Sequence, residues 1–261
     1  MNKEQTISIK SHYLFIMLAA LFITNALIAE LIGVKILSLE KILNIPPLNI
    51  PFIGNSMINL NMSVGVILWP IVFILSDVIN EYYGRKGVRQ ISLISAGLIA
   101  YSFIIILLAT KAPSADFWLD NNALDPDGNA FDIHYAYNSI FRQGLGIMIG
   151  SIISFLVGQL VDAYTFHFLR KLTQHKLLWL RATGSTIVSQ LIDSFLILLI
   201  AFYFFGNWSL IEVISVGIIQ YLYKIIIAIL LTPLIYWAHF IIDRYLGKEF
   251  SKKVIESAVD A

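Results

Sequence analysis

The sequence contains no cysteine and few charged residues. Among its 261 residues, Asp, Glu, Lys and Arg together make up only 13%, whereas a soluble domain usually carries about 25%. The lack of cysteine excludes a disulfide scaffold, a Cys-ligated zinc site and thiol catalysis. The low charge, beside 58% hydrophobic residues, excludes a soluble globular domain and a disordered chain. A net charge of +1 provides no attraction to a polyanion, so we expect no nucleic-acid partner.

Long apolar stretches without charge indicate a polytopic protein that lies in a lipid bilayer. The mean hydropathy is +0.78, and a membrane-crossing helix needs roughly 20 mostly apolar residues. We predict an all-α membrane helix bundle of six transmembrane helices over 13–245, with a cytoplasmic N-terminus, 1–12, and a cytoplasmic C-terminal tail, 246–261. The six predicted spans cover residues 13–37, 61–82, 89–110, 139–168, 181–205 and 209–242.

Basic residues gather in alternate loops. Lys and Arg precede the first predicted span and follow the second, fourth and sixth, whereas the remaining loops hold only Lys41 and Lys111. Because cytoplasmic loops collect Lys and Arg, this pattern places both termini in the cytoplasm and supports an even number of spans. Arg170, Lys171, Lys176 and Arg181 belong, in this interpretation, to the cytoplasmic loop after the fourth span.

The loop over 111–138 is the only sizeable polar segment outside the spans. Asp125-Pro-Asp-Gly-Asn129 is similar to the start of a calcium-binding loop. That pattern then requires Gly and Glu where this chain has Ala130 and Ala136, so we predict a solvated turn. The sequence predicts no metal site and no cofactor. It also contains none of the common hydrolase, Walker A or dinucleotide-binding motifs, so we expect no enzyme.

Ionisable and amide side chains inside the predicted spans are the candidate functional residues. An unpaired charge at mid-bilayer costs roughly 2.5–3.5 kcal/mol, so such residues usually face one another or a water-filled cavity. Helical spacing puts Asp77, Asn80 and Glu81 on one face. Two structural alternatives stay open here. Asp77 and Glu81 could be interfacial anchors, with an i,i+4 pair between Glu81 and Arg85, and Asp193 and Lys224 could form a purely structural ion pair.

Three segments of the chain are similar to a known family. They are FILSDVINEYYGRK at Phe73 to Lys86, GQLVD at Gly158 to Asp162, and WLRATGSTIVSQLID at Trp179 to Asp193. Over roughly residues 13–245, the chain resembles the queuosine-precursor transporter family, also described as vitamin-uptake-transporter-like. The resemblance implies a six-spanning protein of the bacterial inner membrane. It also implies import of 7-cyano- or 7-aminomethyl-7-deazaguanine, precursors of a modified tRNA base.

The implied deazapurine suits the polar residues of the spans. Its ring N–H and exocyclic amine can donate together to one carboxylate, its carbonyl needs a donor, and its flat face stacks on aromatic rings. We expect the aromatic face from Trp69, Tyr83, Trp179 and Tyr223. The predicted substrate-binding residues are Asp162, Gln159, Asp193, Gln190, Ser189, Ser185 and Lys224. The predicted gate or coupling residues are Asp77, Asn80, Glu81, Arg85 and Glu30.

Our hypothesis is a secondary transporter whose site lies between spans two, four and five and is closed by span six. Lys224 would neutralise an acid when the site is empty, and three spans per half are compatible with inverted halves. Proton coupling through a carboxylate and passive facilitation both stay open, as does a homo-oligomer. The alternative functions are a substrate-binding subunit of a multicomponent ATP-driven vitamin importer and, in a different class, a membrane enzyme.

Overall fold

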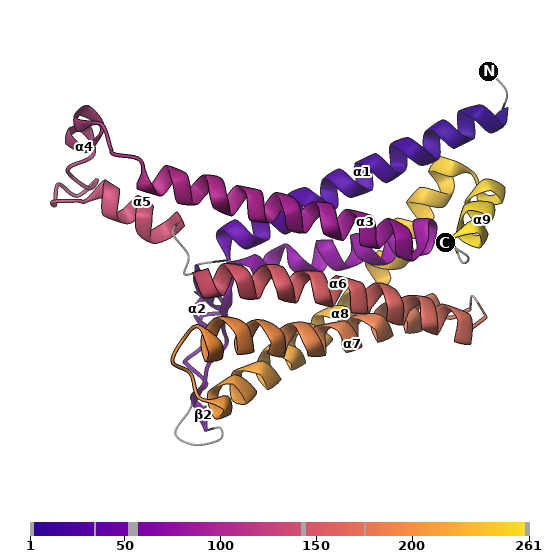
Figure 1. Ribbon diagram of the computed structural model, residues 1–261. Helices are drawn as coiled ribbons and strands as arrows, with labels where there is room; N and C mark the ends of the chain where they lie inside the picture. Colours follow the sequence, from indigo (N-terminus) through magenta and orange to yellow (C-terminus); the bar gives the residue numbers. More distant parts are fainter. Residues whose placement is uncertain (1–2, 34, 52–56, 142–144, 175, 259–261) are drawn as a thin grey trace.

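The computed structural model describes residues 3–33, 35–51, 57–141, 145–174 and 176–258. Within these ranges, five helices are long and apolar enough to cross a membrane. The chain is therefore a polytopic membrane helix bundle, as predicted (Figure 1). The five helices are α1 (Lys3–Ile32), α3 (Trp69–Lys111), α6 (Leu145–Leu172), α7 (Leu178–Leu198), which continues as the π-helix η2 (Leu199–Phe204), and α8 (Leu210–Leu246).

Helix α3 accounts for both the second and the third predicted spans. Its 43 residues would measure about 65 Å if straight, roughly twice the thickness of the hydrocarbon core. The helix is instead broken at Gly84, whose φ of 68° and ψ of −171° are almost restricted to glycine. Figure 1 shows the two legs of α3 running side by side in opposite directions. The predicted spans 61–82 and 89–110 are thus joined by a glycine reversal within one element.

Other helix boundaries differ from the prediction by several residues. Helix α1 includes most of the predicted N-terminal tail and ends at Ile32, and the strand β1 (Ile36–Ser38) follows. The fourth predicted span, 139–168, starts later than expected, because α5 (Ile133–Phe141) is a helix separate from α6. Residues 1–2 and 259–261 of the two predicted tails lie outside the described residues.

The basic connections share one end of the bundle. The start of α1, the reversal in α3, the α6–α7 connection and the C-terminal helix α9 (Lys248–Ser257) all lie at that end in Figure 1. The loops with few basic residues lie at the opposite end. This arrangement agrees with the alternation of Lys and Arg along the sequence, and the cytoplasmic location of the basic end stays a prediction. We call the basic end the inner end and the opposite end the outer end.

Between α1 and α3 the chain forms a small outer segment organised around Glu40. Its carboxylate is buried and accepts the N–H groups of Leu48 at 3.2 Å and Leu60 at 3.0 Å and the hydroxyl of Ser38. The Leu60 N–H, above all, lowers the pKa of Glu40. The segment comprises β1, α2 (Leu39–Ile42), β2 (Ile50–Pro51), β3 (Met57–Ile58), β4 (Asn61–Ser63) and the 3₁₀ helix η1 (Val64–Ile67), with antiparallel pairs β1–β4 and β2–β3.

The outer loop after α3 contains the predicted turn. It holds the short helix α4 (Asp116–Asn121), and then the carboxylate of Asp125 accepts the N–H groups of Asp127 at 3.0 Å and Asn129 at 2.8 Å. This is an Asx-type turn, and the hydrogen bonds from Asn129 lower the pKa of Asp125. Within the part of the chain that the structure describes, no group of three or more His, Asp or Glu residues could hold a metal ion.

Small residues let α6 approach α7 closely. A Cβ atom built on Gly150 would lie 3.2 Å from the backbone nitrogen of Ala201, and one on Gly158 would lie 3.4 Å from the Cβ of Asp193. Such small positions allow two membrane helices to pack backbone to backbone. The close contact brings the polar residues of α6 and α7 face to face.

Candidate functional site

Helix α7 presents a line of polar side chains to its neighbours. Arg181, Ser185, Ser189 and Asp193 are spaced four residues apart, so they lie on one face of the helix. These side chains of α7 lie next to polar residues of α3, α6 or α8. The result is three polar groups at successive depths, which we call the outer pocket, the acid pair and the inner clasp.

The outer pocket is a small, partly open cavity between α3, α6, α7 and α8. It combines aromatic rings with amide and charged groups. Its lining residues are Trp69, Phe73, Phe155, Gly158, Gln159, Gln190, Asp193 and Lys224.

Three aromatic rings form one side of the outer pocket. The ring of Trp69 lies 6.1 Å from that of Phe73, at an interplanar angle of 23°, and 6.0 Å from that of Phe155. Of the four aromatic residues predicted from the sequence, Trp69 lines the pocket. Trp179 is instead 46% exposed, and Tyr83 donates its hydroxyl to the carbonyl of Ser11. Phe73 and Phe155 escaped prediction because aromatic residues are common throughout apolar spans.

The charged side of the outer pocket is the ion pair of Asp193 and Lys224. The side chains are 23% and 20% exposed. The hydroxyl of Ser154 also donates to Oδ1 of Asp193 at 2.8 Å. Close by, Oε1 of Gln190 is buried and accepts no hydrogen bond. The pocket therefore offers a carboxylate, an ammonium group and an unused amide oxygen beside flat apolar rings.

Glu30 on α1, which we predicted as a gate or coupling residue, is connected to the outer pocket through α6. It projects from α1 and accepts the hydroxyl of Ser151 on α6. Ser151 and Ser154 are three residues apart on α6, so the two serines connect Glu30 to Asp193 along one helical face.

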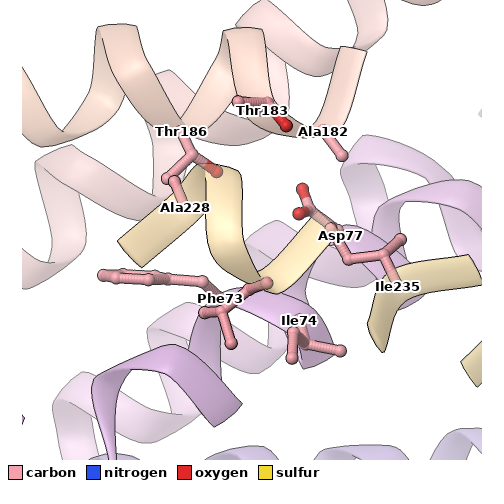
Figure 2. Close-up of a pocket in the computed structure, with 9 residues that line it drawn as sticks. Phe73, Ile74, Asp77, Ala182, Thr183, Thr186, Ala228 and Ile235 are labelled. Atoms are coloured by element: carbon pink, nitrogen blue, oxygen red, sulfur yellow. The ribbon is translucent and has the colours of Figure 1, made fainter. Parts of the chain in front are cut away.

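The acid pair consists of Asp77 on α3 and Asp162 on α6, which are 2% and 6% exposed. Ser189 donates to Oδ1 of Asp162 at 3.2 Å, and Oδ1 of Asp77 has no hydrogen-bond partner. Figure 2 shows the carboxylate of Asp77 pointing toward α7 in a second small cavity, which we call the deep pocket. The deep pocket is lined by Phe73, Ile74, Asp77, Ala182, Thr183, Thr186, Ala228, Leu231 and Ile235.

Two hydrogen bonds hold α3 against α6 near the acid pair. The hydroxyl of Ser76 donates to Oε1 of Gln159 at 2.9 Å, and the amide of Asn80 donates to the carbonyl of Ala163 at 3.3 Å. Gln159 also lines the outer pocket. The outer pocket and the acid pair are thus adjacent and share the α3–α6 contact.

The inner clasp is a buried cluster of one acid and two arginines. Nη2 of Arg181 lies 2.7 Å from Oε1 of Glu81, and Nη2 of Arg170 lies 3.9 Å from the same oxygen. The prediction that both arginines belong to a solvated loop is wrong, because each lies within a helix and turns its guanidinium into the bundle. The i,i+4 pair of Glu81 with Arg85, one of the alternatives left open by the sequence, is not among the ion pairs of the described residues. Arg85 instead lies over the ring of Tyr164, 5.3 Å from its centroid.

Helix α9 packs next to the inner clasp at the inner end of the bundle. Arg170 donates to the carbonyl of Ile255 on α9. Asp243, near the end of α8, accepts the hydroxyl of Ser251 on α9 and, at 2.8 Å, that of Tyr82 on α3. These contacts tie α9 directly to α6 and α8, and through Asp243 to α3.

Comparison with known protein families identifies the chain. Residues 63–238 match the family described as "Putative vitamin uptake transporter". The chain belongs to this family. Its family and its long apolar helices make it a multi-pass bacterial membrane protein.

Two curated relatives of this transporter are named "Probable queuosine precursor transporter". The protein from Bacillus subtilis (strain 168) is 28% identical over 186 residues, which cover 70% of this chain and 73% of the relative. The protein from Haemophilus influenzae (strain ATCC 51907) is 27% identical over 174 residues, covering 64% of this chain and 63% of that relative. No solved structure gives a significant match.

The matched region of the transporter includes both pockets and the arginines of the clasp. Of the residues predicted to bind substrate, Gln159, Gln190, Asp193 and Lys224 lie together in the outer pocket. Asp162 does not line it, contrary to the expectation that Asp162 and Asp193 hold one ligand. Ser185 donates to the carbonyl of Ala182. Arg170 and Arg181 could have been suspected from the sequence only through their nearness to the family-like motifs.

Proposed function

We propose that this transporter imports a queuosine precursor, 7-cyano- or 7-aminomethyl-7-deazaguanine, and binds it in the outer pocket. The names of the two relatives support this substrate class. The observation on which the proposal rests is the composition of the pocket, which combines aromatic rings with a carboxylate, an ammonium group and two amides. A flat, uncharged or weakly cationic heterocycle with hydrogen-bonding edges fits that combination.

The polar edge of a deazaguanine matches the polar side of the pocket. Its ring N–H and exocyclic amine would donate to the carboxylate of Asp193, as adjacent donors do in bidentate pairs. The unused Oε1 of Gln190 would accept a further N–H. The rings of Trp69, Phe73 and Phe155 would cover the flat face, since aromatic groups gain from offset stacking.

Binding would rearrange the Asp193–Lys224 ion pair. In the empty pocket, Lys224 neutralises the carboxylate, which lowers the cost of keeping that acid within the membrane. A bound deazaguanine would displace the ammonium group from Asp193 and receive it at its own carbonyl. One ion pair would thereby be exchanged for two hydrogen-bonded contacts with the substrate, and neither charge would be left alone.

The inner clasp would close the route from the pocket to the cytoplasmic end. Glu81, Arg170 and Arg181 lie between the acid pair and the inner end of the bundle, and all three are at most 5% exposed. Release of α9 and separation of the clasp would open this route after substrate has entered from outside. Asp77, Asn80 and Glu81 keep the gate or coupling function that we predicted from the sequence.

Competition binding with purified transporter tests the proposal. Labelled 7-cyano-7-deazaguanine should bind and be displaced by either deazaguanine, but not by riboflavin or thiamine. Asp193→Asn should weaken binding roughly 10- to 100-fold, because a hydrogen bond to a charged group contributes about 1.5–3 kcal/mol. The matched control is Asp120→Asn on the exposed α4, which should bind normally. Equal displacement by vitamins, or normal binding by Asp193→Asn, would overturn the assignment.

The description of the family as a vitamin uptake transporter favours a second candidate function, a substrate-binding subunit of an ATP-driven importer. Such a subunit binds solute but moves it only with its ATPase partners. Exchange of labelled for unlabelled deazaguanine across proteoliposomes that contain this chain alone would exclude that role. Binding without any exchange would favour it.

A further inference from the structure

Asp77 and Asp162 form a buried acid pair without a basic partner. Among the described residues, the ion pairs join Lys224 to Asp193 and the two arginines of the clasp to Glu81, and neither Asp77 nor Asp162 takes part in one. Helix α7 faces Asp162 with serine hydroxyls, and that of Ser189 donates to its Oδ1 at 3.2 Å. An acid pair of this kind, at the depth of a membrane interior, requires an additional positive charge.

Within the ranges that the structure describes, the surroundings of Asp77 supply no such charge. The charged groups that act on it are Asp162 on α6 and Glu81 on α3 itself, and both are acids. Helix α7 faces it with Ala182 and two threonines, and α8 faces it with Ala228, Leu231 and Ile235. Two carboxylates that share a desolvated site resist ionising together, which favours uptake of a proton by the pair.

The residues that line the deep pocket suit a proton better than a metal ion. Hard cations in proteins take about six or more oxygen ligands. The lining of the deep pocket offers the carboxylate of Asp77 and the hydroxyls of Thr183 and Thr186 among otherwise apolar side chains. The hydroxyl of Thr183 is also engaged with that of Thr232, at 2.9 Å. The unpartnered, buried Oδ1 of Asp77 is thus suited to carry a proton.

The acid pair is connected to the outer pocket by two contacts. Phe73 lines both the outer and the deep pocket. Ser76, next to Asp77, donates to Gln159, which lines the outer pocket and lies three residues from Asp162 on α6. A substrate that moves Gln159 or Phe73 would therefore alter the environment of both acids.

We propose that Asp77 and Asp162 are the proton-binding site that couples proton entry to substrate import, which rests on the proposed function of the outer pocket. A proton enters from the outer side, binds a carboxyl oxygen of the pair while the substrate occupies the outer pocket, and leaves to the inner side after the clasp opens. The neutral pair permits the loaded bundle to rearrange, and the ionised pair resists it.

Proteoliposomes that contain the transporter test this inference with two measurements. With the membrane potential clamped at zero, an outside-acid gradient of one pH unit should drive roughly tenfold accumulation of 7-cyano-7-deazaguanine, if one proton accompanies each molecule. Entrapped pH dye should report acidification of the lumen when substrate is added. Counterflow exchange of labelled for unlabelled substrate needs no net proton movement and serves as the second measurement.

Asp77→Asn should affect proton-driven accumulation and counterflow differently. Because the amide is permanently neutral, we expect accumulation to fall to the equilibrium ratio of one while counterflow is retained. Asp162→Asn should behave in the same way, and Asp120→Asn on α4 should keep both activities. If the Asp77 variant does not fold, Asp162→Asn decides the assignment to this pair, and the wild-type dye experiment decides proton coupling.

The outcomes distinguish the coupling site from the function itself. Wild-type counterflow without substrate-driven acidification would overturn proton coupling and leave the proposed function intact. Accumulation driven by the pH gradient in both Asp→Asn variants would overturn the assignment to this pair. If wild type shows no deazaguanine counterflow, the proposed function fails, and the proton-site inference fails with it.

Discussion

The guanidinium of Arg181 on α7 lies 2.7 Å from the carboxylate of Glu81 on α3, and the two side chains are only 5% and 3% exposed. The residues are 100 positions apart in the sequence. Their pairing lies toward the inner end of the bundle and joins the two segments that most resemble the transporter family. Several consequences of this and related contacts can be measured.

Removing Arg181 from the clasp should strongly destabilise the protein. Arg181→Gln leaves Glu81 with the more distant Arg170, and breaking one partner of a buried pair costs about 3–5 kcal/mol. We expect a clear fall in the midpoint of thermal unfolding in detergent. Arg244→Gln is the control, because Arg244 lies at the same end of the bundle but is exposed. Equal midpoints for the two variants would show that the clasp adds no stability.

The reversal in α3 should depend on Gly84. Its φ of 68° and ψ of −171° strain any residue with a Cβ by about 1–3 kcal/mol, so Gly84→Ala should lower the thermal midpoint and the yield of folded protein. Gly97→Ala, in the second leg of α3, is the control, since a Cβ there would meet nothing within 4 Å. The prediction is wrong if both alanine variants melt alike.

Lys224 should decide between the neutral and the cationic deazaguanine. Lys224→Met removes the positive charge beside Asp193. The ammonium group of the aminomethyl form would then pair with the Asp193 carboxylate in its place. We expect its affinity relative to the cyano form to rise roughly tenfold, the scale of one charge-assisted hydrogen bond. Competition binding measures this ratio. Lys41→Met, in the exposed outer segment, should leave the ratio unchanged, and a constant ratio in Lys224→Met would contradict the proposed exchange.

The outer segment should lose stability in acid through Glu40. The backbone N–H of Leu60, above all, holds the pKa of this carboxyl below its ordinary value. The stabilisation is therefore complete above the pKa of the unfolded chain and disappears as pH falls through the lower, folded value. Proteolysis of the segment between α1 and α3 should become faster over that range in wild type. Glu40→Gln should be cleaved rapidly at neutral pH already, with little further change in acid; a variant that resists cleavage at neutral pH would refute this.

Much of the architecture follows from the sequence alone, because a bilayer places strong constraints on composition. Apolar length determines which segments can cross, and the alternation of Lys and Arg determines which connections share one end. The cost of buried charge singled out Asp193 and Lys224 as candidates for a substrate or proton site in the interior. The family-like motifs at Phe73 to Lys86 and Trp179 to Asp193 indicated the family correctly.

Only the tertiary structure decided which of these groups meet. Local spacing favoured Glu81 with Arg85, yet the packing of α7 against α3 brings Arg181 to Glu81 instead. It also separates Asp162 from Asp193, which helical spacing could not do, because the depth and rotation of one helix relative to another depend on side-chain packing. Hydropathy indicates only that a residue lies in the membrane. Which residues lie next to the polar side chains of α6 and α7 depends on the close contact between these two helices.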